Sequence, residues 1–243
     1  MITLYGSGPA YGVNDLSPFV VKVATYCRLA DIEYTQKSGD PRKAPKGKIP
    51  FLRDGDTTVC DSSAIVEHLR AKHRDLDVGL GARERAVATA LKGMFEEHTY
   101  FCVMYLRWQD PRGWVVQEKT FQDFFRSAGV VPGIAVPFVV RMVRKQALKM
   151  LHGQGTGRHS VEEVEAIVKS HLDAASELLG DNDYLFGSEA RVIDATMWAF
   201  LACLRGFPVE TSASAHLAAR KNLVAYIDRI RARHWRDAGG GKA

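Results

Sequence analysis

The chain has 243 residues, of which 46% are hydrophobic, and its formal net charge is +5. This length allows two ordinary domains or one large domain, with enough apolar content for a real core. No run approaches the roughly 18 apolar residues of a membrane span, and "MITLYGSG" lacks the basic-then-apolar layout of a secretory signal. We therefore expect a cytoplasmic protein with no membrane partner.

The positive charge does not indicate a nucleic-acid partner. Lys and Arg are spread along the chain beside nearly as many acidic residues, and no DNA- or RNA-reading motif accompanies them. The four cysteines have neither CxxC spacing nor a His partner pattern, which argues against a disulfide framework and against a metal site. We expect them to be mostly buried thiols: Cys27, Cys60, Cys102 and Cys203.

Residues 1–78 alternate between strand and helix patterns. The sequence predicts a strand at "MITLY", a helix from Pro18, and a second strand at "IEYTQK". "IPFLRDGDTTVCD" then predicts two strands joined by a tight Asp-Gly turn, and "DSSAIVEHLRAKH" predicts a helix. The order is βαβ followed by ββα, so this segment is expected to form a small α/β domain.

Residues 82–236 are almost wholly helical in pattern. One buried stripe is predicted along Leu91, Met94, Phe95, His98, Cys102 and Tyr105. "HSVEEVEAI" predicts a helix start, with Ser160 and Glu163 at capping-box spacing. "DAGGGKA" is predicted to be a frayed tail. The sequence thus predicts an α/β domain over 1–78 and an all-helical domain over 82–236.

Three short motifs stand out in the first domain: Ser17-Pro18-Phe19 at a helix start, Ile49-Pro50 at a strand start, and Asp61-Ser62-Ser63 at another helix start. Each has a structural explanation by itself, because Ser and Asp are good N-caps and Pro suits a first helical position or an edge strand. Their combination is more informative than any one of them.

In this order and at these spacings the motifs resemble the glutathione transferase family, whose first domain is thioredoxin-like. "GKIPFLRDGDTTVCDSSAIVEHL" resembles the family's glutathione-binding segment, and the resemblance covers essentially the whole chain. "DPRKAPKGKIPFL", "DSSAI" and "GQGTGRHSVEE" look like the bacterial members related to failed axon connections and metaxin. The resemblance implies a thioredoxin-like domain followed by an all-helical domain, with glutathione as co-substrate, and a homodimer as in most relatives.

The resemblance also implies how glutathione is bound. Pro50 would be cis and would turn the backbone of Ile49 toward the cysteinyl part of the tripeptide. Asp61 would take the γ-glutamyl ammonium, while the Ser62 hydroxyl and the helix-end N–H groups would take the carboxylate. Two further residues are candidates. Ser63 would add to the hydroxyl and N–H groups that take the γ-glutamyl carboxylate, and Lys48 either meets the glycyl carboxylate or is an ordinary exposed lysine.

Ser17 matches the position at which relatives carry a catalytic Ser or Cys. Free thiols have a pKa of about 8.5, and a hydroxyl donor at a helix N-terminus would stabilise the reactive thiolate. Serine favours conjugation over the thiol exchange that Cys would support. The preceding loop is longer than in common transferases and carries Tyr11 and Asn14, and Tyr11 is a rival donor, which we rank behind Ser17.

The helical half is expected to supply the pocket for the electrophile. Its aromatic residues cluster soon after the domain junction: Tyr100, Tyr105, Trp108, Trp114, Phe121 and Phe124. Core packing is the favoured role for Tyr105, and Trp108 and Trp114 are candidates for a pocket rim. An apolar pocket beside a thiolate suits small uncharged electrophiles, epoxides among them.

The leading hypothesis is therefore an enzyme that conjugates glutathione to a small hydrophobic electrophile. The alternative is a non-catalytic scaffold of the metaxin type, which has no physical need for the intact set of Ser17, Pro50, Asp61 and Ser62.

The sequence departs from the family pattern at the cap of a buried helix. Relatives carry Ser or Thr three residues before Asp194, whereas this chain has Arg191 there, which puts that cap in doubt.

Overall fold

The first domain contains a four-stranded mixed sheet with the strand order β2-β1-β3-β4. This computed structural model describes residues 1–40, 44–129 and 131–235. The first strand runs parallel to the second and antiparallel to the third, and the third pairs antiparallel with the fourth. The elements are β1 (Ile2–Gly6), α1 (Pro18–Leu29), β2 (Tyr34–Ser38), β3 (Phe51–Asp54), β4 (Thr57–Cys60) and α2 (Ser62–Lys72).

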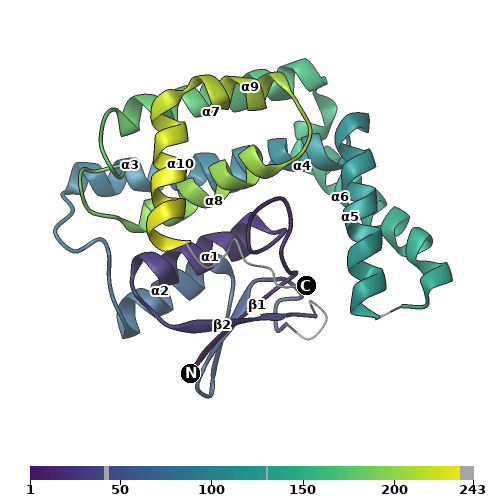
Figure 1. The fold of residues 1–243 in the computed structure, drawn as a ribbon, viewed down its shortest axis with the longest axis horizontal. Coiled ribbons are helices and arrows are strands. Elements are labelled where there is room, and N and C mark those ends of the chain that lie inside the picture. The colour runs from purple at the N-terminus through teal and green to yellow at the C-terminus, as the bar shows by residue number, and fades with distance from the viewer. Residues whose placement is uncertain (41–43, 130, 236–243) are drawn as a thin grey trace.

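Helix α1 lies between the sheet and the helical domain (Figure 1). Most of its residues are buried, since it packs on the sheet on one side and on α8 (Val192–Gly206) on the other. Apolar residues at successive positions, such as Val20 and Val21, suit a helix that is covered all round.

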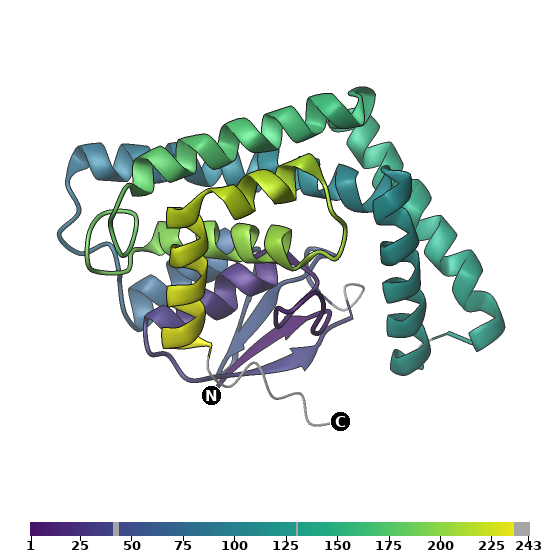
Figure 2. The same ribbon diagram turned by 45° about the horizontal axis from the view of Figure 1, so that its top comes forward.

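The second domain consists of helices stacked over α1 and α2, and the predicted fold class is confirmed. Helices α5 and α6 run side by side and extend past the body of the domain (Figures 1 and 2). The remaining elements are α3 (Ala82–Gly93), η2 (Met94–Thr99), α4 (Tyr100–Trp108), α5 (Pro111–Ala128), η3 (Gly133–Ala135), α6 (Val136–Gln154), η4 (Thr156–Arg158), α7 (Val161–Leu179), α9 (Ser212–Ala219) and α10 (Lys221–His234). None of the described helices is long and apolar enough to cross a membrane.

The predicted stripe through His98 is partly wrong. The segment η2 is a π-helical turn, which is wider than an α-helical turn, so the residues inside it do not follow the predicted 3.6-residue spacing. As a result Glu96 and Thr99 are buried, whereas His98 is exposed. Leu91, Phe95, Cys102 and Tyr105 are buried as predicted.

The sequence raised two helix caps, the Ser160–Glu163 capping box of α7 and the cap of α8 at Arg191 and Asp194. The capping box is confirmed, because the Glu163 N–H donates to Ser160 Oγ at 3.2 Å and the Ser160 N–H donates to Glu163 Oε2 at 2.7 Å. At α8 the Asp194 carboxylate accepts from the N–H groups of Arg191, at 2.8 Å, and Leu185, at 3.0 Å. The Arg191 side chain instead donates to the carbonyls of Leu76 and Val78 at the domain junction. Of the capping box seen in relatives, the Asp194 half is therefore kept and the Ser or Thr half is absent.

Three of the four cysteines are buried thiols, namely Cys27, Cys102 and Cys203, whereas Cys60 is half-buried. This agrees with the prediction. The predicted frayed tail "DAGGGKA" lies outside the described residues, as does the end of the predicted helical domain at residue 236.

Candidate functional site

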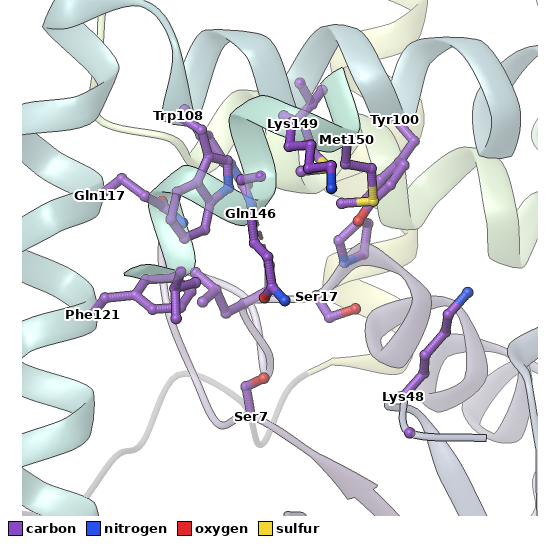
Figure 3. A pocket seen from close by; sticks show the side chains of 18 residues that line it. Ser7, Ser17, Lys48, Tyr100, Trp108, Gln117, Phe121, Gln146, Lys149 and Met150 are labelled. Carbon is purple, nitrogen blue, oxygen red and sulfur yellow. Dashed lines mark hydrogen bonds between the residues drawn. The ribbon is translucent and has the colours of Figure 1, made fainter. Parts of the chain in front are cut away.

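A cavity of about 750 Å³ lies between the α/β domain and helices α4, α5 and α6 (Figure 3). The α/β side contributes mostly polar groups from the loop before α1 and from the segment before β3. The helical side is largely apolar. Its lining residues include Ser7, Ser17, Lys48, Tyr100, Trp108, Phe121, Gln146 and Met150.

Ser17 occupies the N-cap position of α1 and lines this cavity. Its carbonyl accepts from the N–H groups of Val20 and Val21, so the residue begins the helix through its backbone. Its hydroxyl, however, makes no capping hydrogen bond, which corrects the expectation that Ser17 is a side-chain cap. The hydroxyl therefore remains available to a ligand in the cavity.

Asp15 holds the loop that carries Ser17, and sequence reasoning missed it. It is fully buried, and its carboxylate accepts from the N–H groups of Ser17 at 2.9 Å and Gly8 at 2.8 Å and from Gln36 Nε2 at 3.1 Å. Burial raises the pKa of this carboxyl to about 6, against the lowering effect of these donors. A Cβ at Gly6 would lie 2.2 Å from Asp15 Oδ2, so this close approach requires glycine.

Tyr11 is not itself a lining residue of the Ser17 cavity, but its hydroxyl contacts Gln117, which is one. Its hydroxyl oxygen is 2.8 Å from Gln117 Oε1 and 3.0 Å from Thr120 Oγ1, both on α5. Burial raises the pKa of this phenol, and its ring packs edge-on against Phe207. Of the two predicted donor candidates, Ser17 lines the cavity directly, whereas the Tyr11 hydroxyl is bonded to α5.

The Ile49–Pro50 peptide bond is cis, as the family resemblance implied. The β1–β3 register ends at the pair Tyr5 and Phe51, so Ile49 lies outside this ladder. Lys48 is exposed and lines the cavity.

Asp61 and Ser62 form the beginning of α2. Asp61 has φ 84°, a sparsely populated region for residues with a side chain. Its Oδ1 atom accepts from the N–H groups of Ser63 at 2.9 Å and Ala64 at 3.3 Å, which leaves Oδ2 to face solvent or a ligand. Ser62 is buried, and the Ser63 hydroxyl lies 3.4 Å from Glu96 Oε2, to which it donates.

The predicted aromatic residues divide into two groups. Tyr100, Trp108 and Phe121 line the cavity. The other three do not, since the Tyr105 hydroxyl donates to the His159 carbonyl, Trp114 stacks under Arg144, and Phe124 packs on neighbouring phenylalanines.

Ser7 and Arg107 are among the cavity residues that escaped sequence reasoning. Ser7 adds a second small hydroxyl. Arg107 is 5% exposed and donates to the carbonyls of Leu16, at 3.1 Å, and Cys203, at 3.3 Å. Its guanidinium lies 5.1 Å from the centre of the Tyr11 ring. It therefore fastens the Ser17 loop to the helical domain, and no local sequence signal distinguishes it from a surface arginine.

Comparison with known proteins decides the family. The chain is 36% identical over 239 residues to isoprene-epoxide–glutathione S-transferase of Rhodococcus sp. strain AD45, covering 95% of this chain and 98% of the relative. The chain belongs to the glutathione transferase family. The profile of the glutathione S-transferase N-terminal domain matches residues 18–113, and that of the C-terminal domain matches residues 168–230.

Other relatives and solved structures are more distant. Failed axon connections of Drosophila melanogaster is 29% identical over 84% of this chain and 50% of its own length, and mouse metaxin-1 is 26% identical over 90% and 71%. A glutathione S-transferase structure from Methylobacterium radiotolerans superposes with a TM-score of 0.61 at 17% identity, covering 98% and 92% of the two chains. This structural match shows the shared glutathione transferase fold.

Proposed function

We propose that this protein conjugates glutathione to a small apolar electrophile of the epoxide class. Glutathione would lie along the segment Lys48–Pro50 and the N-terminal end of α2, with its sulfur beside Ser17. The electrophile would occupy the part of the cavity lined by Tyr100, Trp108 and Phe121.

The observation that carries the proposal is that the Ser17 hydroxyl lies at the cavity wall and makes no capping hydrogen bond. A hydroxyl that donates to sulfur at a helix N-terminus favours the thiolate through the hydrogen bond and through the helix dipole. The deprotonated sulfur would attack an epoxide carbon, forming a C–S bond as the C–O bond breaks. The oxygen keeps the electron pair and takes up a proton, which gives a hydroxy thioether.

The relatives support the substrate class. The isoprene-epoxide transferase matches nearly the full length of this chain at higher identity than the metaxin-type relatives. The metaxin-type scaffold is therefore the weaker alternative. A homodimer in the cytoplasm, acting in detoxification, stays a prediction that follows from the family.

The direct test is incubation of the purified protein with glutathione and isoprene monoepoxide. We expect a glutathione adduct, detected by mass spectrometry, at a rate well above the reaction without protein. A buffer reaction and a Ser17→Ala reaction serve as controls. A folded protein that neither forms the adduct nor binds to immobilised glutathione would reject the enzyme and favour the scaffold.

A further inference from the structure

Lys22 is an unusual core residue. It lies in the middle of α1, five residues after Ser17, and is 1% exposed. Burying an ammonium costs several kcal/mol unless the charge is well paired. Lysine side chains at such positions usually extend to solvent. The Lys22 side chain instead ends inside the protein, beneath the beginning of α2.

The Lys22 ammonium has one partner for each of its three N–H donors. It lies 2.6 Å from Glu96 Oε1 and 3.3 Å from both Ser62 Oγ and Ser63 Oγ. Burial lowers the pKa of Lys22, and the adjacent Glu96 carboxylate opposes this effect. The pair thus connects α1 and α2 of the first domain with η2 of the second.

Glu96, like Lys22, is buried and has more than one polar partner. It is 7% exposed, and its Oε1 atom also accepts from Thr196 Oγ1 of α8 at 3.1 Å. The π-helical turn of η2 places this carboxylate inside the protein. Such turns occur frequently at functional sites.

These contacts give the two serine hydroxyls different roles. Ser63 donates its proton to Glu96 Oε2, so that proton is used. Ser62 accepts from Lys22, and none of its contacts among the described residues uses its own hydroxyl proton. Since Asp61 caps the N–H groups of Ser63 and Ala64, the Ser62 N–H is also left at the end of the helix. One hydroxyl, one N–H and a nearby buried cation together suit a carboxylate.

We propose that Lys22 and Glu96 are a positioning pair, which directs the Ser62 hydroxyl toward the α-carboxylate of the γ-glutamyl group of glutathione. This inference rests on the proposed function: the family resemblance already implies that Ser62 takes this carboxylate, and the new assignment is the role of Lys22 and Glu96 in holding Ser62 there. The pair also ties this subsite to the helical domain, since Thr196 and Glu96 both belong to it. Lys22 itself need not touch the ligand.

A purely structural ion pair makes a different prediction. Replacing Lys22 by Met would then change stability, but it would not alter the discrimination between ligands with and without the α-carboxylate. A positioning pair changes that discrimination. It also requires Lys22 and Ser62 to act together, so that their effects on binding do not add.

The test uses two ligands, S-methylglutathione and its analogue in which γ-aminobutyrate replaces the γ-glutamyl residue. They differ only in the α-carboxylate. Isothermal titration calorimetry measures both affinities for the wild type, K22M, S62A and the double variant, with circular dichroism to verify folding. K72M removes a lysine charge from the exposed end of α2, the helix that Ser62 begins, and is the matched control for K22M.

We expect the wild type and K72M to prefer S-methylglutathione by about 10-fold or more. K22M and S62A should each lose most of that preference, and the double variant should lose little more than either. If K22M does not fold, E96Q, which keeps the side-chain shape, takes its place in the cycle. A folded K22M or E96Q with the wild-type preference, or additive losses, would overturn the inference. A wild type that binds neither ligand would instead reject the proposed function.

Discussion

Ser17→Ala should separate the structural role of this residue from its chemical role. An N-cap Ser→Ala substitution ordinarily costs about 1 kcal/mol. Here the hydroxyl makes no capping bond, and the backbone carbonyl that begins α1 is kept. We therefore expect the free energy of unfolding to change by less than about 0.5 kcal/mol, as for a substitution away from any cap.

The effect on the bound thiol should be larger. A hydrogen bond to a charged group contributes about 1.5–3 kcal/mol, which corresponds to roughly 1–2 pKa units at about 1.36 kcal/mol per unit. Ser17→Ala should raise the apparent pKa of bound glutathione by this amount and lower kcat at neutral pH by about 10- to 100-fold.

The assay is the pH dependence of kcat/KM for the wild type and Ser17→Ala, together with urea denaturation of both. Ser7→Ala is the matched control, because it removes a hydroxyl from the same cavity. If Ser17→Ala leaves the pH profile unchanged while Ser7→Ala shifts it, the sulfur donor is assigned wrongly. A stability loss near 1 kcal/mol or more would show that the Ser17 hydroxyl caps the helix after all.

Three further substitutions test the surrounding site. Tyr11→Phe removes the hydroxyl that contacts α5, so it should destabilise the protein by about 1 kcal/mol in urea denaturation. It should leave the thiol pKa unchanged, and a shift in the pH profile would make Tyr11 the donor instead. Asp61→Asn should raise the KM for glutathione about 10-fold or more with a smaller change in kcat, since it removes the charge offered to the ligand ammonium; an unchanged KM would argue against that contact. Asp15→Asn tests pH linkage: because the folded-state pKa of Asp15 is raised from 3.8 to about 6, the folded protein holds a proton that the unfolded chain releases. Its contribution to stability is therefore present below pH 3.8 and is lost as the pH rises through about 6. The unfolding free energy of the wild type minus that of Asp15→Asn should fall by up to about 3 kcal/mol across this window, and a difference that grows with pH would contradict the reasoning.

Local patterns were sufficient to predict most of the architecture. Alternation of apolar residues marks the strands, helical spacing marks α2 and α7, and Ser160 with Glu163 marks a helix start because both halves of a capping box lie within four residues. The cis bond before Pro50 and the acidic-Ser start of α2 followed from the resemblance of short motifs, which lie in the first domain.

Features that depend on distant contacts could not be predicted in this way. Tyr11 bonds to residues more than 100 positions away, so no local pattern shows that its hydroxyl is committed to α5. Asp15 looks like any loop aspartate until its three donors are brought together. The residues within the π-helical turn do not follow 3.6-residue spacing, so Glu96 lies in the core and His98 outside it, although Cys102 and Tyr105 beyond the turn are buried as predicted.

The central claim is that glutathione binds with its sulfur at Ser17, and a crystal structure of the complex tests it most directly. We predict that the sulfur lies within hydrogen-bond reach of Ser17 Oγ, at about 3.2 Å. The cysteinyl backbone should pair with Ile49, and the γ-glutamyl group should lie at Asp61 and Ser62. A sulfur placed beside Ser7 or Tyr11 instead, or glutathione bound outside the cavity, would contradict the account.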